Sequence, residues 1–273
     1  MDYNNLPKLP KREENSNKGT FGKILNVSGS EYMTGAAYLS SISALKIGAG
    51  YVELASQKNA LKAAAALSPE IVLAPVEKIS DIIKTSTVLL IGCGLSTTEE
   101  AEKIFKDTLS LVNNIPVVID ADGLNILAKK NIKLPEKVIL TPHPKEASRL
   151  LACCLDEVLN DMEAAAKAIT QKYNCVTVLK SHRTIVTDGV NIYHNVTGNS
   201  ALAKAGSGDV LAGMIAGLLA QEMNIYDASV LGVYLHGLAG DLAKNDLTAY
   251  GVLASDTIRY ISNAINKYSN QYN

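Results

Sequence analysis

The stretch Asn195–Gln221, NVTGNSALAKAGSGDVLAGMIAGLLAQ, is the most informative part of this chain. A polar turn containing Gly206 and Gly208 delivers Asp209 to the start of a strongly apolar helix, predicted over Asp209–Gln221. Backbone N–H groups at a helix N-terminus lack intrahelical partners and carry partial positive charge. Because the glycines let an anion approach closely, the turn predicts a phosphate or oxyanion site. Asp209 can serve there as a helix cap or as a general base.

Short β-branched runs alternate with helical patterns before this helix, and further helical patterns follow it. The runs are almost continuously apolar, which is typical of strands buried on both faces of a parallel sheet. We therefore expect one α/β domain with a doubly wound, mostly parallel sheet flanked by helices. The strands are predicted at Lys23–Val27, Tyr51–Ala55, Ile71–Val76, Val88–Ile91, Val117–Asp120, Val138–Thr141 and Val176–Lys180.

Asp188-Gly189 lies between two further runs, Thr184–Thr187 and Val190–His194, and predicts a two-residue hairpin. No linker or internal repeat interrupts the alternation. The remaining helices are predicted at Gly35–Ile47, Gln57–Leu67, Thr98–Val112, Pro144–Leu151, Glu157–Tyr173, Asp227–Lys244 and Ser255–Lys267.

Composition and charge exclude several classes of function. The chain has 273 residues and 47% hydrophobic residues, enough for one sizeable domain. Residues 1–20 are polar and predicted as a flexible N-terminal arm, with the domain over residues 21–273.

The charge and the apolar runs argue against two kinds of partner. The net charge is -1 and no block of basic residues is present, so the sequence shows no positively charged surface of the kind that binds nucleic acid. No apolar run reaches the roughly 18–20 residues of a membrane span. Without a leader or CxxC spacing, we expect a cytoplasmic protein with free thiols.

Chemically reactive groups gather where the predicted strands end. In doubly wound sheets, ligands bind beyond the carboxyl ends of the strands. Four polar segments fall there: Gly92-Cys93-Gly94, Asp120-Ala121-Asp122, Thr141-Pro142-His143 and Lys180–Arg183. We therefore expect the ligand site at this edge of the sheet.

These motifs resemble the ribokinase-like superfamily, in which a glycine-rich turn holds the catalytic Asp. More narrowly, they resemble the NAD(P)HX dehydratase family of nicotinamide nucleotide repair enzymes. The family signature N-x-TGN…LA-x-x-G-[ST]-GDVLAG is matched by Asn195, Thr197–Asn199, Leu202-Ala203 and Gly206–Gly213. The resemblance covers residues 20–265, through the further segments Gly35–Gly50, Gly92–Ser96, Asp120–Asn125 and Thr141–Glu146.

The resemblance implies a lyase that dehydrates (6S)-NAD(P)HX to NAD(P)H with ADP or ATP as co-substrate and Mg²⁺. Hydroxide is a poor leaving group whereas phosphate is a good one, so the ring hydroxyl would be phosphorylated and phosphate then eliminated. Asp209 would be the base, and Gly206 and Gly208 would form the anion hole. The family also suggests a homo-oligomer, a tetramer, to whose interface the predicted helix Asp227–Lys244 could contribute.

The resemblance further implies which residues bind the two substrates. Those for the nicotinamide substrate are Ala37, Gly94, Asn125, His143 and Asp209. Those for the nucleotide are Lys180, Ser181, His182, Arg183, Thr184, Asn199 and Gly208. Ser181 stands where the family pattern K-G-x-x-T has glycine, which leaves the geometry of this turn open.

Several of these residues have a second interpretation. Glu146 could bind Mg²⁺ through water or complement a helix dipole. Asp120 and Asp122, with Asn125, could place carboxylates near a magnesium-bound phosphate, or one Asp, Asp122, could cap the following helix. His143, taken alone, is a polar loop residue, and Lys180–Arg183 could be a solvated basic turn. His236, on an apolar helix, is expected to be a core or interface histidine.

Two other functions remain open at this point. A small-molecule kinase of the same superfamily, acting on a vitamin precursor or a sugar-like alcohol, would release a stable phosphorylated product. A nucleotide-sensing module would keep the pocket without turnover. The intact Gly206–Asp209 turn argues against the sensing module, and Thr141–Glu146 with Lys180–Thr184 favours the dehydratase.

Overall fold

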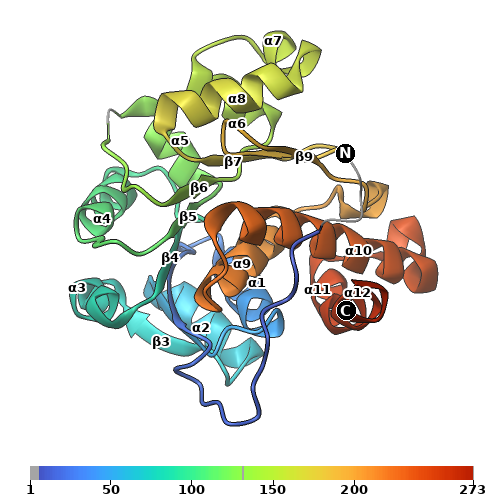
Figure 1. Cartoon of the computed structure of the whole chain (residues 1–273). Coiled ribbons are helices and arrows are strands. Elements are labelled where there is room, and N and C mark those ends of the chain that lie inside the picture. Colours follow the sequence, from blue (N-terminus) through green and yellow to red (C-terminus); the bar gives the residue numbers. More distant parts are fainter. Residues whose placement is uncertain (1–5, 131, 273) are drawn as a thin grey trace.

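The computed structural model describes residues 6–130 and 132–272. Nine strands of the described chain form one sheet in the order β3-β2-β1-β4-β5-β6-β7-β8-β9 (Figure 1). β1 to β7 pair in parallel, and β8 and β9 continue the sheet as an antiparallel edge. The strands are β1 Lys23–Val27, β2 Tyr51–Ser56, β3 Val72–Pro75, β4 Val88–Ile91, β5 Val117–Ile119, β6 Val138–Leu140, β7 Val176–Leu179, β8 Ile185–Thr187 and β9 Ile192–His194. The predicted mostly parallel, doubly wound sheet is confirmed.

Helices cover both faces of the sheet (Figure 1). In β4, Val88 and Leu90 pack in one hydrophobic core, whereas Leu89 and Ile91 pack in the other. Because alternate side chains of a strand point to opposite faces, two buried faces require the continuous apolar run seen in the sequence. One core contains residues of α1, α2, α9, α10, α11 and α12, and the other contains residues of α3, α4, α5, α6, α7 and α8.

The helices are α1 Thr34–Lys46, α2 Lys58–Leu67, α3 Ile79–Ile82, α4 Glu99–Ser110, α5 Asp122–Lys129, α6 Pro144–Leu151, α7 Leu155–Asn160, α8 Met162–Tyr173, α9 Ser207–Ala220, α10 Ile225–Gly251, α11 Ala254–Arg259 and α12 Ile261–Tyr272. The short α3 and α5 were not among the predicted helices. The predicted helix 157–173 is divided, because Asp161 has extended-type backbone (φ -145°, ψ 83°) and caps α8 by accepting a hydrogen bond from Ala164 N. The predicted helix 255–267 is likewise divided, at Tyr260.

The predicted two-residue hairpin is wrong. Thr187 pairs with Ile192, so four residues, 188–191, connect β8 to β9. The Asp188 carboxylate accepts hydrogen bonds from the backbone N–H groups of Val190 and Asn191, at 2.9 and 2.6 Å. Asp188 therefore closes the loop with its side chain instead of forming the first half of an Asp-Gly turn.

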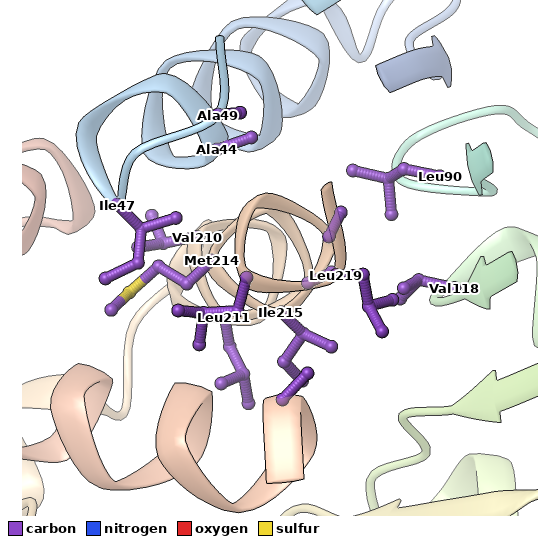
Figure 2. Packing of buried hydrophobic residues seen from close by; sticks show 14 of the residues in the cluster. Ala44, Ile47, Ala49, Leu90, Val118, Val210, Leu211, Met214, Ile215 and Leu219 are labelled. Carbon is purple, nitrogen blue, oxygen red and sulfur yellow. The ribbon is translucent and has the colours of Figure 1, made fainter. Parts of the chain in front are cut away.

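Helix α9 is packed between the sheet and α1. Figure 2 shows its apolar side chains in contact with residues of both elements. Two glycines let the backbones of α9 and α1 approach closely: a Cβ added at Gly213 would lie 2.1 Å from Ser40 O, and one at Gly217 would lie 2.2 Å from Ile47 Cγ2. α9 begins at Ser207, two residues before the predicted start, and Asp209 therefore lies within its first turn.

The described part of the N-terminal segment is attached to the domain by hydrogen bonds and by packing of Leu6 and Leu9 against the core. Tyr268 Oη donates a hydrogen bond to Pro7 O at 2.7 Å. Arg12 donates to Gly48 O and Gln221 Oε1, and its guanidinium lies 3.5 Å from the centre of the Phe21 ring. The segment predicted as a flexible arm is thus anchored at Pro7 and Arg12, while its first five residues lie outside the described part. None of the described helices combines the length and apolarity needed to cross a membrane.

Candidate active site

The first turn of α9 forms the centre of the site. Gly206 precedes the helix with a φ of 92°, in the left-handed region that favours glycine. Ser207 N donates to Lys204 O, whereas the N–H groups of Gly208 and Asp209 in the first turn have no helical partners and are available to an anion. Asp209 is partly buried in this turn, and its pKa is raised to about 6 because burial and the nearby Asp120 carboxylate outweigh the opposing effects of Cys93 and Lys180. Near neutral pH, Asp209 is therefore an ionised base.

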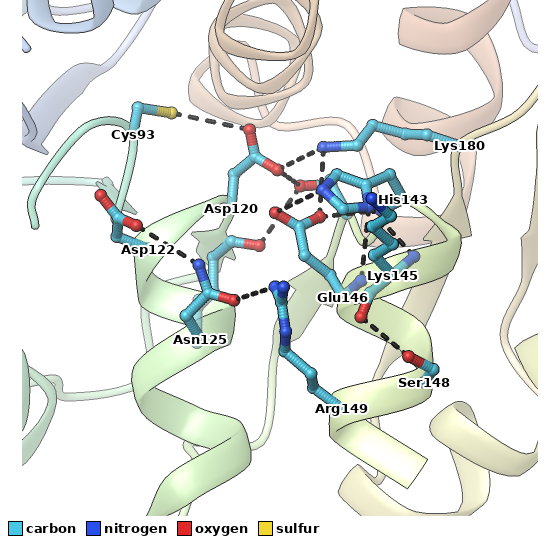
Figure 3. Close-up of polar contacts among 12 residues, drawn as sticks. Cys93, Asp120, Asp122, Asn125, His143, Lys145, Glu146, Ser148, Arg149 and Lys180 are labelled. Carbon is cyan, nitrogen blue, oxygen red and sulfur yellow. Dashed lines mark hydrogen bonds and ion pairs between the residues drawn. The ribbon is translucent and has the colours of Figure 1, made fainter. Parts of the chain in front are cut away.

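A buried ion pair lies beside Asp209. Asp120 follows β5 and Lys180 follows β7, and Lys180 Nζ lies 2.6 Å from Asp120 Oδ1 (Figure 3). Thr141, which follows β6, donates to the same oxygen at 2.7 Å. Burial lowers the pKa of Lys180, but Asp120 and Glu146 more than offset this, so the net pKa of Lys180 is raised. The ammonium therefore stays charged at the end of the sheet.

His143 and Glu146 form a capping box at the start of α6. His143 Nδ1 accepts hydrogen bonds from the backbone N–H groups of Lys145 and Glu146, and Glu146 Oε2 accepts from His143 N at 2.8 Å (Figure 3). Because Nδ1 is an acceptor, the proton of the neutral ring is on Nε2. Burial and the nearby Lys180 lower the pKa of His143. His143 is thus a neutral residue that can donate a hydrogen bond.

Glu146 is 5% exposed, and burial raises its pKa to about 7 although Lys180, 3.8 Å away, opposes the shift. Its observed role is local, as the partner of the His143 N–H. This position at the helix N-terminus agrees with the second interpretation of Glu146 and leaves the first untested. A water-mediated contact with a metal remains a prediction.

Cys93 completes the cluster around Asp209. One ligand atom each of Cys93, Asp120 and Asp209 lie within 4.8 Å of one another, and Cys93 Sγ lies 3.8 Å from Asp120 Oδ2. Cys93 is fully buried, and its pKa is raised well above the usual value by burial and by the two carboxylates. It therefore stays a thiol that donates a hydrogen bond to the Asp120 carboxylate. Cys93, Asp120 and Thr141 lie in the strand-end segments where the sequence predicts the ligand site, but no individual role was predicted for Cys93 or Thr141.

A cavity of about 970 Å³ opens beside the N-terminus of α9. Its lining mixes cationic, amide and apolar side chains, which suits a ligand that combines phosphate with an aromatic base. Among the residues predicted to bind the two substrates, the cavity is lined by His143, Lys180, Ser181, His182, Thr184, Asn199 and Gly208. It is also lined by Asn195, Thr197, Leu202, Leu211, Val233 and His236.

The loop before α9 is held in place by α10. Gly198 N and Asn199 Nδ2 donate to the two oxygens of Asp241, at 3.0 and 2.7 Å. Thr197 Oγ1 donates to Tyr234 O at 2.7 Å. The amide groups of Asn195 and Asn199 are both engaged within the loop or with α10, so they shape this wall of the cavity. This role of Asp241, on the helix predicted over Asp227–Lys244, was not predicted from the sequence.

Comparison with known proteins identifies the family. The family model described as NAD(P)H-hydrate dehydratase matches residues 24–263. The chain belongs to the NAD(P)H-hydrate dehydratase family. The family predicted from the sequence is thereby confirmed.

Named relatives of this family cover almost the whole chain. It is 39% identical over 267 residues to the ADP-dependent (S)-NAD(P)H-hydrate dehydratase of Neisseria meningitidis, covering 94% of this chain and 90% of that protein. It is 34% identical over 265 residues to the bifunctional NAD(P)H-hydrate repair enzyme Nnr of Coxiella burnetii, covering 96% of this chain. The chain spans only about half, 54%, of that bifunctional relative.

Solved structures agree with this assignment. The Bacillus subtilis ADP/ATP-dependent NAD(P)H-hydrate dehydratase, co-crystallized with ATP/Mg²⁺, has a TM-score of 0.87 at 30% identity, covering 95% of this chain and 94% of that one. A hydroxyethylthiazole kinase from Pyrococcus horikoshii has a TM-score of 0.67 at 14% identity, covering 92% and 93%, which shows the shared fold alone. The ribokinase-like fold is therefore confirmed.

The departure from the family pattern at Ser181 is accommodated without strain. Ser181 Oγ accepts a hydrogen bond from Arg183 N at 3.1 Å, and Ser181 N donates to Thr184 Oγ1 at 3.3 Å. Ser181 is not among the described residues with a left-handed backbone, so glycine is not required at this position. Arg183 is exposed and does not line the cavity, unlike its neighbour His182.

The other predicted nicotinamide-binding residues lie outside the cavity lining. Ala37 is fully buried on α1. Gly94 has a φ of 59°, and a Cβ there would lie 2.7 Å from Ala36 Cβ. Asn125 Oδ1 accepts from Arg149 at 2.8 Å. Asp209 directly follows Gly208, which lines the cavity, and contacts Cys93, which directly precedes Gly94, so Asp209 adjoins both the cavity and Gly94.

Asp122 does not cap α5, which corrects that interpretation. The N-cap residue is Ala121, and Asp122 is the first residue of the helix. The Asp122 carboxylate accepts hydrogen bonds from Ser96 N at 2.8 Å and from Asn125 Nδ2 at 3.3 Å. It therefore joins the loop after β4 to α5.

Proposed function

We propose that this chain dehydrates (6S)-NAD(P)HX to NAD(P)H, with ADP or ATP as co-substrate. The observation that carries the proposal is the position of Asp209, a base in the anion-binding turn, adjoining both the cavity and Gly94. The names of the N. meningitidis and B. subtilis relatives support a dehydratase, which is a hydro-lyase. In this proposal, the cavity takes the nucleotide and the Gly94 side takes the nicotinamide.

Asp209 accepts the proton of the ring hydroxyl as its oxygen attacks the terminal phosphorus of the nucleotide. General-base assistance of this kind contributes typically about 10²–10⁴-fold in rate. The N–H groups of the α9 first turn stabilise the charge on the transferring phosphoryl group. The nucleotide leaves with one phosphate fewer. The phosphorylated hydrate then expels inorganic phosphate, assisted by the ring nitrogen, and loses a proton to give NAD(P)H.

The donor set fits Mg²⁺, which would neutralise charge on the nucleotide phosphates. Asp120 Oδ2, which does not bond Lys180, would hold it, since Mg²⁺ prefers carboxylate oxygens, while the nearby Asp209 carboxylate stays free to accept a proton. The mutual repulsion of these two carboxylates raises the pKa of Asp209, and a cation would relieve it. Glu146, predicted as a water-mediated ligand, would complete the set.

We further propose that the enzyme is a cytoplasmic homo-oligomer, a tetramer, without nucleic-acid or membrane partners. The residues of α10 from Ala228 to Gly240 are buried within this chain, which leaves them unavailable to a partner. Apolar side chains exposed at and just after the end of α10, Leu247, Tyr250 and Leu253, would supply the contact instead.

Turnover of NADHX with Mg-ADP tests the proposal. The expected result is a rise in NADH absorbance with one phosphate released for each NADH. Asp209→Asn should lower the rate about 10²–10⁴-fold while nucleotide binding persists. Asp107→Asn, which changes an exposed carboxylate on α4, is the matched control. Near-normal turnover by Asp209→Asn would remove Asp209 from the base role, and a stable phosphorylated product without NADH would establish the kinase alternative.

A further inference from the structure

One buried polar atom in the described structure has no hydrogen-bond partner. His236 on α10 is 8% exposed, and its Nε2 is the single such side-chain N or O atom in residues 6–130 and 132–272. A buried polar atom left without a partner costs about 1–3 kcal/mol. Native structures keep few of them, and those that remain call for an explanation such as an absent ligand.

The surroundings of His236 place it against the nucleotide cavity. His236 is among the residues that line the cavity, together with Ser207 and Gly208, the first residues of α9. The neighbouring Gly237 packs tightly on the loop before α9, since a Cβ there would lie 2.2 Å from Thr197 Oγ1. The backbone next to His236 is therefore in direct contact with this loop of the cavity wall.

The imidazole is neutral at physiological pH. Burial and the positive charge of Lys180 lower its pKa to about 4, although an interaction with the Ser207 backbone opposes this shift. A neutral imidazole offers one N–H donor and one lone pair. A phosphate group offers only acceptors, so it fits one of the two tautomers. A hydroxyl both donates and accepts, and it fits either tautomer.

The nearest hydroxyls of a bound nucleotide are those of its ribose. In the proposed function, the phosphates bind at the first turn of α9, and the ribose is joined directly to them. His236 contacts Ser207 of that turn. We propose that His236 recognises a ribose hydroxyl of the nucleotide co-substrate, an inference that rests on the proposed function. His236 is then a binding residue, not the core or interface histidine expected from the sequence.

Binding of ADP and its deoxy analogues, measured by calorimetry with Mg²⁺, tests this assignment. His236→Phe keeps a planar ring and removes both nitrogens, and His194→Phe, which changes a half-exposed histidine on β9, is the control. ADP should bind His236→Phe roughly five- to tenfold more weakly than wild type, as expected for the loss of one buried hydrogen bond. Either 2′-deoxy-ADP or 3′-deoxy-ADP should bind wild type more weakly by a similar factor. His236→Phe should bind that analogue and ADP equally.

Three results would overturn the assignment. Unchanged ADP affinity in His236→Phe would show that no contact exists. A loss that is the same for ADP and both deoxy analogues would show a structural role. Loss of discrimination against inosine diphosphate, with ribose discrimination intact, would assign the contact to the base. His236→Gln, which retains polar atoms, should recover part of the affinity and serves if the Phe variant unfolds.

These measurements separate the inference from the proposed function because they need no NAD(P)HX. A wild-type protein that distinguishes ADP from a deoxy analogue through His236 but forms no NADH would contradict the function alone. Normal NADH formation together with unchanged ADP binding by His236→Phe would contradict the inference alone. A wild type that binds neither ADP nor ATP would contradict both.

Discussion

The two ends of the sheet carry similar ion pairs in different settings. Near the amino ends, Lys23 Nζ lies 2.8 Å from Glu53 Oε2, and the side chains are 25% and 15% exposed. At the carboxyl ends, Lys180 Nζ lies 2.6 Å from Asp120 Oδ1, and the side chains are 18% and 1% exposed. The first pair keeps contact with water on both sides. The second contains a carboxylate that is almost completely removed from water.

The carboxyl end also holds more negative charge than its lysine can balance. Asp120, Glu146 and Asp209 all interact with Lys180, and the pKa values of Glu146 and Asp209 are raised to about 7 and about 6. Unfavourable electrostatics of this kind persist where the surrounding fold enforces them, and they cluster at functional sites. Of the two ends, the carboxyl end of the sheet is therefore the one arranged for chemistry rather than for stability.

The largest effect is expected from breaking the buried pair. Lys180→Met leaves Asp120 buried without its partner, which should lower the free energy of unfolding by about 3–5 kcal/mol. Urea unfolding at pH 7 measures this change. Adding Asp120→Asn to Lys180→Met should restore part of the loss, because the uncompensated charge is then removed. If Lys180→Met lost less than about 1 kcal/mol, the buried pair would contribute no more to stability than the partly exposed pair at the amino end, and the prediction would be wrong.

A smaller effect of opposite sign is expected for Asp209→Asn. The pKa of Asp209 is raised in the folded state from 3.8 to about 6, so folded protein binds this proton more tightly than unfolded protein does. As pH rises from 3.8 to about 6, ionisation of Asp209 destabilises the fold. Above pH 6 the free energy of unfolding is lowered by the full amount, up to about 3 kcal/mol. Asp209→Asn should therefore be more stable than wild type at pH 8. At pH 3.5 the difference should vanish, and an equal difference at both pH values would contradict the raised pKa.

The same cluster predicts an acid limb in the pH dependence of the reaction. Asp209 must be ionised to accept a proton, so kcat/KM should fall about tenfold for each pH unit below about 6. Because Glu146 titrates nearby, the apparent pKa belongs to the coupled group. Steady-state rates from pH 5 to 9 provide the measurement. Glu53→Gln, at the amino end, should leave the limb in place; a rate that stays flat down to pH 5 would contradict the prediction.

The smallest effect is expected at the amino end itself. Lys23→Met removes a partly exposed pair, and such pairs contribute about 0–1 kcal/mol. Urea unfolding should give a change within this range, and turnover should be unaltered. Lys23 also donates to Thr85 Oγ1 at 3.0 Å. A larger loss in the free energy of unfolding would mean that Lys23 contributes more to stability than its exposure indicates.

Features set by local sequence could be predicted, whereas features set by distant contacts could not. The turn at Gly206–Asp209 and the buried strands follow from spacing within a few residues. The Asp120–Lys180 pair joins residues 60 positions apart, and Asp241 reaches Gly198 across 43 positions. Only the sheet order brings these partners together. Asp161 breaks a helical pattern through its own backbone angles, which the apolar periodicity does not report.

The close approach of α9 and α1 at Gly213 and Gly217 has a kinetic consequence. Because α1 leaves no free space along one side of α9, α9 cannot shift when a phosphate binds at its N-terminus. The first turn of α9 is therefore already ordered before the anion binds. The amide hydrogens in the middle of α9 should then exchange with solvent only when the whole domain opens. The anion site would thus belong to the slowest-exchanging part of the molecule, with its geometry ready before either substrate enters.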